Sequence, residues 1–396
     1  MAFLSGKVFT QRLRDMRAMM EANGLDALAF TSPDFFQYAT NFHVDVQPWE
    51  RPIVAVVPRD GTPFAVMNEL STNHIRFARE RGTLWFSDIH IYSEHPRVAN
   101  RLPLVGQWPE MVAELLRAAG LGRGRIGVDS AGGPLGRVPA LLPDLKLVPT
   151  LAAMRALRWV KTKEEIAVHR AAAELSDWGQ ARYRENIRPG RLVQELDNAM
   201  AALIVEEAAK RFPGENAEPR CWTLSGPASA SPHGEGAPTG ARFEKGHVVV
   251  TICNIRLNGM VSENERTFFV GRPSNRQAAL YEAARAANEA GSAAAIVGNP
   301  VSAIDAAAQS AIEQAGFGEH ILHRTGHGMG VQGHEYPEDM AFNQRPLRVG
   351  EVYSVEPGLY VWGLGGFRID DTVVIAAGKP QILTASPRDI KSNTLG

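Results

Sequence analysis

Histidines and glycines are concentrated in one short stretch near the C-terminal end of the chain, HRTGHGMGVQGHEYPE. Four of the chain's eleven histidines lie between His320 and His334. His327 stands between Gly326 and Gly328, and residues without side chains let backbone or a ligand approach closely. This spacing predicts a functional site around His327.

Two carboxylates follow the histidines, each inside a run of apolar residues. Glu356 lies in SVEPGLYV, and Asp370 lies in FRIDDTVVI. Both runs are typical of partly buried strands. A buried carboxylate without a partner costs several kcal/mol, so we expect a cation, a proton or a hydrogen-bond donor beside each of them.

Two more carboxylates belong to a predicted hairpin, HVVVTICNIRLNGMVSENERTFFVG. The Asn-Gly pair at 258–259 is the strongest short-range signal for a tight turn. Counting outward from this turn pairs Asn254 with Glu263 and Ile252 with Glu265, so the two glutamates share one face of the strand. Such alternation is found at exposed strand edges, but the apolar residues on both sides favour a polar cavity within a buried sheet.

Length and composition limit the classes of protein to which the chain can belong. It has 396 residues, of which 44% are hydrophobic and 21% charged, and its net charge is −1. This is the composition of an ordinary globular protein with room for two domains. The balanced charge does not favour nucleic acid or an anionic membrane as a partner, so we expect a small molecule.

The cysteines and the N-terminal residues indicate the cellular compartment in which the protein is expected. Cys221 and Cys253 make neither a secreted disulfide framework nor, without CxxC spacing, a zinc site. The first residues, MAFLSGKVFTQRLRDMRAMM, are charged and contain no apolar core followed by a cleavage site. No run reaches the roughly 18 apolar residues of a membrane span. We therefore expect a cytoplasmic protein.

The first part of the chain alternates helices with short apolar strands. A helical pattern over residues 8–23 ends at an Asn-Gly pair, and the strand-like LDALAFTS follows. This alternation continues to about residue 155 and predicts an α/β domain. Within it, Trp49 and Arg51 precede a strand. They are either surface residues that pack together, or an aromatic wall with an anion clamp for a substrate carboxylate.

The pattern changes near residue 160. Thr162 and Glu165 have the spacing of a capping box, and long helical stretches follow. We therefore predict two domains, residues 1–160 and residues 161–396. Between the second long helix and the hairpin lies a loop rich in proline and glycine, GPASASPHGEGAPTGARFEKG, which contains His233. A lone histidine in a loop is more often solvated than catalytic.

Several of these motifs together resemble a known superfamily. GMVSENERT, TGHGMG followed by GHEYPE, SVEPGLY and GFRIDDTVVI occur in the order found in the pita-bread fold of methionine aminopeptidase, aminopeptidase P, prolidase and creatinase. The N-terminal part is similar to that of the last three. The resemblance implies an α/β (α+β) protein, with a small creatinase-like N-terminal domain and a C-terminal pita-bread domain.

The metallopeptidases of this superfamily hold two divalent ions with two aspartates, one histidine and two glutamates. Carried over by position, the resemblance places metal ligands at Glu263, His327, Glu356 and Asp370. The remaining aspartate falls on Ile252, so one of the two ions lacks a principal ligand. The resemblance then implies one divalent ion, for which carboxylates and imidazole suit Mn²⁺, Fe²⁺ or Zn²⁺.

Creatinase is the metal-free branch of the superfamily, and some motifs resemble it. Its hairpin also ends in ERT, which places a functional glutamate at Glu265, and its catalytic histidine falls on His233. Its carboxylate clamp resembles Trp49 and Arg51. Glu338, however, stands where creatinase has a substrate-binding arginine, so creatine is not expected as the substrate.

The sequence leaves three functions open. The first is a metal-assisted hydrolase of a short peptide or amide, with His233 and His334 moving protons. Arg51, with Trp49 and Arg368, would then bind the substrate, a dipeptide or another small carboxylate-bearing molecule.

The second is a metal-free hydrolase of an amidine, guanidino or cyclic C–N compound, in which Glu265 and Glu356 bind the substrate and His233 is the base. The third is an inactive binding module. The resemblance also implies a homodimer, in which the N-terminal domain of one subunit completes the active site of its neighbour.

Overall fold

The computed structural model describes residues 3–93, 104–234, 237–336 and 339–396. Contacts divide the chain into two compact units, one formed by Leu4–Arg158 and the other by Trp159–Gly396 with Met1–Phe3. The boundary expected at residue 160 lies two residues beyond this division. Within the described ranges, no helix combines the length and the apolar character that a membrane span requires.

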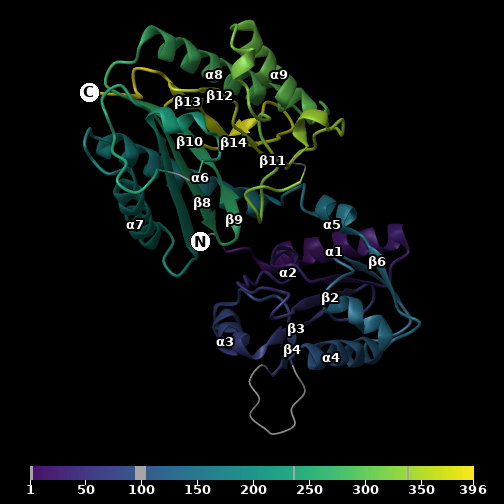
Figure 1. Cartoon of the computed structure of the whole chain (residues 1–396). Helices are drawn as coiled ribbons and strands as arrows, with labels where there is room; N and C mark the ends of the chain where they lie inside the picture. Colours follow the sequence, from purple (N-terminus) through teal and green to yellow (C-terminus); the bar gives the residue numbers. More distant parts are fainter. Residues whose placement is uncertain (1–2, 94–103, 235–236, 337–338) are drawn as a thin grey trace. The chain divides into compact units, whose positions relative to one another are not determined.

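The first unit is built on a six-stranded sheet in the order β4-β3-β2-β1-β5-β6 (Figure 1). Strands β1, β2 and β3 pair antiparallel, and the pairs β3/β4, β1/β5 and β5/β6 are parallel. The strands are β1 (Ala27–Phe30), β2 (Val54–Pro58), β3 (Phe64–Asn68), β4 (Asp88–Tyr92), β5 (Arg125–Val128) and β6 (Lys146–Pro149).

Helices cover both faces of this sheet because its buried strands turn successive side chains to opposite sides. Leu28 and Phe30 of β1 pack with residues of α1, α2, α3 and α5, whereas Ala27 and Ala29 pack with residues of α4. The helices are α1 (Gly6–Asn23), α2 (Pro33–Thr40), α3 (Thr72–Arg81), α4 (Leu104–Ala118) and α5 (Leu151–Leu157), with 3₁₀ turns at η1 (Glu69–Ser71) and η2 (Leu135–Ala140).

The second unit contains a sheet in the order β11-β14-β10-β8-β7, to which β9, β15 and β16 add short pairings, and a separate hairpin β12-β13. The strands are β7 (Ala217–Ser225), β8 (Val248–Leu257), β9 (Met260–Ser262), β10 (Asn264–Val270), β11 (Val352–Val355), β12 (Gly358–Val361), β13 (Gly365–Arg368), β14 (Asp370–Val374), β15 (Gln381–Ile382) and β16 (Thr394–Leu395). The expected combination of a small α/β unit with a larger α+β unit is confirmed.

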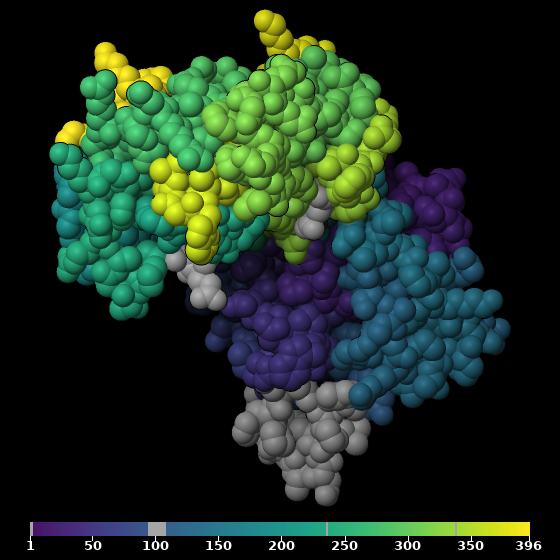
Figure 2. Space-filling model, turned by 45° about the horizontal axis from the view of Figure 1, so that its top comes forward, coloured from purple at the N-terminus to yellow at the C-terminus, as the bar shows by residue number. Residues whose placement is uncertain are grey.

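Two pairs of helices pack on this second sheet. Helices α6 (Lys163–Asn186) and α7 (Val193–Arg211) contact β7 and β8, and α8 (Asn275–Ala294) and α9 (Ser302–Gln314) pack on the other side, with α8 against β13. The outer sides of α8 and α9 form part of the surface of this unit, drawn in green in Figure 2. Three 3₁₀ turns complete it: η3 (Gly226–Ala230), η4 (Gly318–His320) and η5 (Met340–Phe342).

The local signals that define α6 and the hairpin are confirmed. Helix α6 begins with a capping box, in which the backbone N–H of Glu165 donates to Thr162 Oγ1 and that of Thr162 donates to Glu165 Oε2 at 2.6 Å. At the turn, residue 258 has φ 46° and residue 259 has φ 90°, the left-handed conformation that favours asparagine and glycine. Ile252 pairs with Glu265, as counted from the turn.

A buried histidine in α6 makes stability depend on pH. The side chain of His169 is fully buried. Burial, with nearby Lys161, lowers the pKa of His169 to about 4. The folded protein therefore keeps His169 neutral where the unfolded chain, with an ordinary pKa near 6.5, takes up a proton.

We expect neutral His169 to contribute fully to the free energy of unfolding above pH 6.5. This contribution should disappear as the pH falls toward 4, because in this window the unfolded chain binds more protons than the folded protein. Between pH 7 and pH 5, this should lower the free energy of unfolding by about 2 kcal/mol. Urea denaturation of the native protein and His169→Gln at both pH values measures the difference. An equal pH dependence in the two proteins would contradict it.

Candidate active site

The predicted hairpin, the histidine stretch and the C-terminal strands meet around one cavity of the second unit. Its volume is about 460 Å³, within the range of small-molecule sites. The lining includes Ile252 and Glu265 from the hairpin, His334 from the histidine stretch, and Glu356 and Arg368 from the C-terminal strands. Glu263 and Glu265 both line it, so the hairpin face does form a polar cavity.

Strand pairing explains why residues far apart in the chain converge here. Glu265 of β10 pairs directly with Asp370 of β14. Glu356 follows the last residue of β11, which pairs with the neighbour of Asp370 on β14. The backbone carbonyl of His327 accepts a 2.9 Å hydrogen bond from the N–H of Ser354 in β11. The sheet thus holds three acidic side chains and the imidazole in register.

Gly326 is required for this close approach. A Cβ atom at Gly326 would lie 2.0 Å from the backbone oxygen of Ser354, which is far inside van der Waals contact. Because that oxygen belongs to the backbone of a buried strand, it has little freedom to move. The glycines around His327 therefore bring the histidine stretch against β11.

His327 is the centre of the site. Its Nδ1 lies 3.0 Å from the carbonyl oxygen of Gly328, to which it donates, so Nε2 points to the carboxylates. Nε2 lies 3.5 Å from Glu263 Oε2 and 3.4 Å from Glu356 Oε1, longer than a good hydrogen bond, and has no hydrogen-bond partner. Burial alone would lower the pKa of His327, but the two carboxylates raise it well above its ordinary value.

The donor atoms form two groups among the described residues. Glu263, His327 and His334 make one group and Glu265, Glu356 and Asp370 the other, each with ligand atoms within 4.8 Å of one another. The four predicted metal ligands are therefore divided between two groups. Glu356 links them, because it belongs to the second group and contacts His327 of the first.

Arg368 neutralises part of the second group. Its guanidinium is buried, forms an ion pair with Glu265 and lies 4.0 Å from Glu356 Oε2. Nη1 also donates to the carbonyl of Pro232 at 3.0 Å. Arg368 lines the cavity while it is paired with Glu265, and its predicted role in substrate binding stays a prediction.

Burial makes the acids of the second group hard to ionise. It raises the pKa of Glu265 to about 8, although Arg368 acts in the opposite direction. Burial, followed by the charge of Glu265, also raises the pKa of Asp370 well above its usual range. Glu356 differs because His327 and Arg368 outweigh its burial and lower its pKa. Burial therefore opposes ionisation at Glu265 and Asp370, whereas neighbouring positive charge favours it at Glu356.

The structure brings the two predicted catalytic histidines to the cavity. The ring of His334 stacks on His327 with centroids 3.7 Å apart, and burial, with the charge of His327, lowers its pKa. His233 lines the same cavity and lies 6.0 Å, ring to ring, from His323. The loop histidine is therefore part of the site, although its catalytic role stays a prediction.

Trp49 and Arg51 belong to the first unit. The indole of Trp49 is 74% exposed, and Arg51 pairs with Glu50 at 3.0 Å. Their predicted role as a carboxylate clamp stays a prediction. Glu338, the residue that departs from the creatinase pattern, lies outside the described residues.

Strand β7 forms one wall of the cavity, which the sequence pattern did not predict. Its residues Arg220 and Trp222 line the cavity and pair with Asn254 and Ile252 of β8. The sequence contains a signal for this strand, because the segment AEPRCWTLS precedes the hairpin and can pair beside it. Cys221 pairs with Cys253 between these positions, and both are free thiols.

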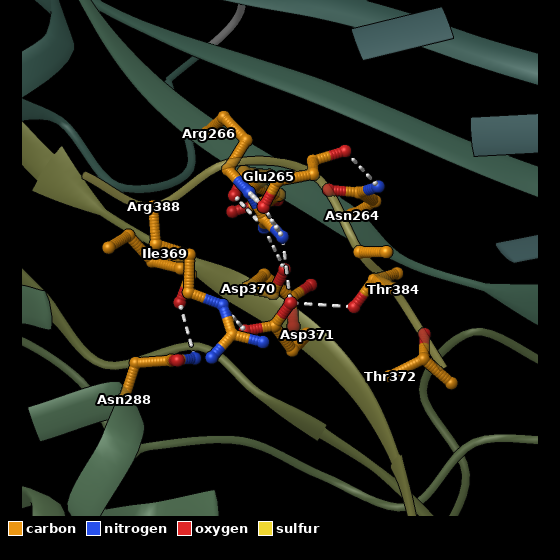
Figure 3. A network of polar contacts seen from close by, with 12 residues as sticks. Asn264, Glu265, Arg266, Asn288, Ile369, Asp370, Asp371, Thr372, Thr384 and Arg388 are labelled. Carbon is orange, nitrogen blue, oxygen red and sulfur yellow. Dashed lines mark hydrogen bonds and ion pairs between the residues drawn. The ribbon is translucent and has the colours of Figure 1, made fainter. Parts of the chain in front are cut away.

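A polar network supports the acidic residues from behind. Arg266 Nη1 donates to the backbone carbonyls of Glu265 at 2.8 Å and Asp370 at 2.7 Å, and Nη2 donates to Asp371 Oδ1 at 2.8 Å. Arg388 lies 3.1 Å from the other oxygen of Asp371 (Figure 3). One arginine thus joins the two strands that carry Glu265 and Asp370.

Comparison with known families agrees with this arrangement. Residues 167–377 match the model of metallopeptidase family M24, and residues 12–160 match the creatinase/prolidase N-terminal domain. The chain belongs to metallopeptidase family M24. As a member of this family it is a peptidase, a hydrolase that acts on C–N bonds.

Individual relatives cover part or all of the chain. The Xaa-Pro dipeptidase of Pyrococcus furiosus is 33% identical over 234 residues, which span 59% of this chain and 65% of that enzyme. Among solved structures, the dipeptidase PepE from Mycobacterium ulcerans is 27% identical, with a TM-score of 0.81 and 99% of both chains covered. The prolidase from Thermococcus sibiricus is 26% identical, with a TM-score of 0.80 and coverage of 96% and 98%.

The residues of the site fit one divalent cation. The buried Nε2 of His327 lies between two carboxylates without a hydrogen-bond partner, so an ion that replaced its proton would meet one nitrogen and carboxylate oxygens, a donor set that suits Mn²⁺, Fe²⁺ or Zn²⁺. A second ion fits less well, because Ile252 offers no ligand and the Arg368 guanidinium is paired with Glu265. The donor set therefore matches one ion better than two.

Proposed function

We propose that this M24 member is a dipeptidase that hydrolyses the peptide bond of short, carboxylate-bearing peptides with one divalent ion. Its relatives include proteins named dipeptidase, Xaa-Pro dipeptidase and prolidase. The observation that carries the proposal is the His327 imidazole, buried between Glu263 and Glu356 without a hydrogen-bond partner.

Each side chain has a role in this proposal. Glu263, His327 and Glu356 would hold the ion, and Asp370 would support Glu356 from the neighbouring strand. A divalent ion in such a site polarises the scissile carbonyl and lowers the pKa of water. His334 and His233 line the cavity, where imidazole can donate a proton to the leaving amine. Glu265 holds Arg368 in place.

The second candidate is a metal-free hydrolase of an amidine or guanidino compound. It is favoured by His233, which lines the cavity and could act as the base. However, the Arg368 guanidinium already pairs with Glu265 and approaches Glu356, the two residues that would bind a cationic substrate. A substrate guanidinium would have to displace it, so the dipeptidase proposal is preferred.

Metal analysis of protein purified without chelator tests the proposal. We expect about one divalent ion per chain, hydrolysis of alanyl-proline or another dipeptide, and loss of at least ~10²-fold of the activity after exhaustive chelation. Re-addition of Mn²⁺, Fe²⁺ or Zn²⁺ one at a time should restore activity and identify the ion. Undiminished turnover in metal-free protein, together with inactive His233→Ala, would overturn the metal proposal in favour of the second candidate.

We also propose a homodimer, in which Trp49 and Arg51 of one subunit would reach the site of the other; the resemblance to creatinase-like enzymes supports this proposal. Light scattering at micromolar concentration gives the mass. A fully active monomer would exclude a site shared between subunits.

A further inference from the structure

Arginine side chains in the cavity differ in their partners. Arg368 is paired with Glu265, and Arg256 donates to the carbonyl of Val331 at 2.8 Å and lies 3.8 Å from an oxygen of Glu218. Arg220 has neither a hydrogen bond nor an ion pair with any described residue. Among the arginines of the described lining, Arg220 is therefore the one whose positive charge is not paired with a described acidic group.

Arg220 is nevertheless held in place. Its guanidinium carbon lies 5.1 Å from the ring centroid of Trp222, two residues along the same strand and on the same face. Stacking on an aromatic ring orients a guanidinium while leaving its N–H groups available to a ligand. The buried Nε1 of Trp222 also has no hydrogen-bond partner among the described residues.

Strand register relates Arg220 to the metal-binding residues. Arg220 pairs with Asn254 of β8, and continuing the β8–β10 register places Asn254 opposite Glu263. Arg220, Asn254 and Glu263 thus form a row across the sheet. The row spans two strand spacings, or about 10 Å. Asn254 Oδ1, in the middle, is buried without a hydrogen-bond partner.

The length of this row suits a dipeptide. Only one residue of a dipeptide, at most about 3.6 Å when extended, lies beyond the scissile bond, and the long Arg220 side chain covers the remaining distance. A peptide whose scissile bond lies at Glu263 and His327 would place its far end next to Arg220. The polar atoms of Asn254 would lie along its backbone.

We propose that Arg220, stacked on Trp222, is the binding site for the substrate carboxylate, so that the cavity selects anionic dipeptides. The inference rests on the proposed peptidase function and makes it more specific. A carboxylate matches the planar N–H pair of a guanidinium in a bidentate geometry. It also supplies the acceptor that Arg220 lacks within the protein.

Steady-state kinetics of Arg220→Met tests this proposal, since methionine keeps an apolar side chain on Trp222 without the charge. Two probes carry a carboxylate: alanyl-proline at its C-terminus and alanyl-aspartic acid 1-amide on its side chain. Two probes carry none: alanyl-prolinamide and alanyl-aspartate diamide, in which both carboxyl groups are amidated. We expect KM for alanyl-proline to rise about 10- to 100-fold, the loss of one charge-assisted contact, with kcat unchanged. Turnover of the fully amidated probes should not change.

A matched control is Arg182→Met, which removes another arginine stacked on an indole, that of Trp178, at 5.3 Å and outside the cavity lining. It should alter no kinetic constant. Arg51→Met compares this site with the predicted clamp of the first unit: a preference for acid over amide that is lost in Arg51→Met but kept in Arg220→Met would overturn the inference. If the side-chain acid binds like alanyl-proline, the site accepts a carboxylate from either source.

Failure of the inference and failure of the proposed function are distinguishable. Hydrolysis of the probes by the native protein tests the function. Calorimetric binding of alanyl-proline and alanyl-prolinamide tests Arg220 whether or not hydrolysis occurs. The native protein should bind the acid more tightly and Arg220→Met should lose that preference. Equal effects of Arg220→Met on acid and amide, or no effect on either, would overturn the inference.

Discussion

Replacing His327 by alanine is expected to abolish binding of the proposed metal ion and to lower the activity at least ~10³-fold, a loss of several kcal/mol of transition-state stabilisation. Nε2 of the imidazole lies 3.5 Å from Glu263 and 3.4 Å from Glu356. Without it, two buried carboxylates face each other across a gap, and like charges this close retain protons rather than bind metal. Metal content of the purified variant, measured beside its turnover of alanyl-proline, gives both values.

Controls separate this effect from unfolding. His74→Ala removes an exposed histidine of the first unit and should change neither metal content nor rate. Circular dichroism should show native secondary structure for both variants. A His327→Ala protein that keeps one ion per chain and near-native turnover would show that the ion is held by other residues, and the second group around Asp370 would be the next candidate.

Local sequence signals were enough to predict much of the site. The Asn-Gly turn set the register of the hairpin, and a period of two residues then put Glu263 and Glu265 on one face. The glycines beside His327 indicated a close approach, which β11 provides. These features depend on residues near one another in the chain, so pattern and turn chemistry determine them.

Other parts depend on contacts that no local pattern encodes. The ion pair between Glu265 and Arg368 joins β10 to β13 across more than a hundred residues, so its effect on the charge of the cavity was not foreseen. Strand β7 was missed because it is polar at alternate positions and precedes a loop rich in proline and glycine. Its place beside β8, and hence the position of Arg220, follows from sheet order.

Arg266→Met is expected to destabilise the second unit by about 3–5 kcal/mol, the cost of breaking a buried ion pair. The guanidinium is almost completely buried and its partner Asp371 fully so. Its loss also leaves the carbonyls of Glu265, Asp370 and Ser386 without this donor (Figure 3). A thermal midpoint lower by roughly 6–20 °C is the expected result for a unit of this size.

An exposed ion pair provides the matched control. Arg285→Met removes a half-buried arginine of α8 from Glu282 and Glu289, which should cost no more than about 1 kcal/mol. The double variant Arg266→Met/Asp371→Asn removes both buried charges, so it should lose less than the sum of the single changes. An Arg266→Met midpoint as high as that of Arg285→Met would mean that Arg388 alone balances Asp371, and that the strands carrying Glu265 and Asp370 are held together by their backbone pairing.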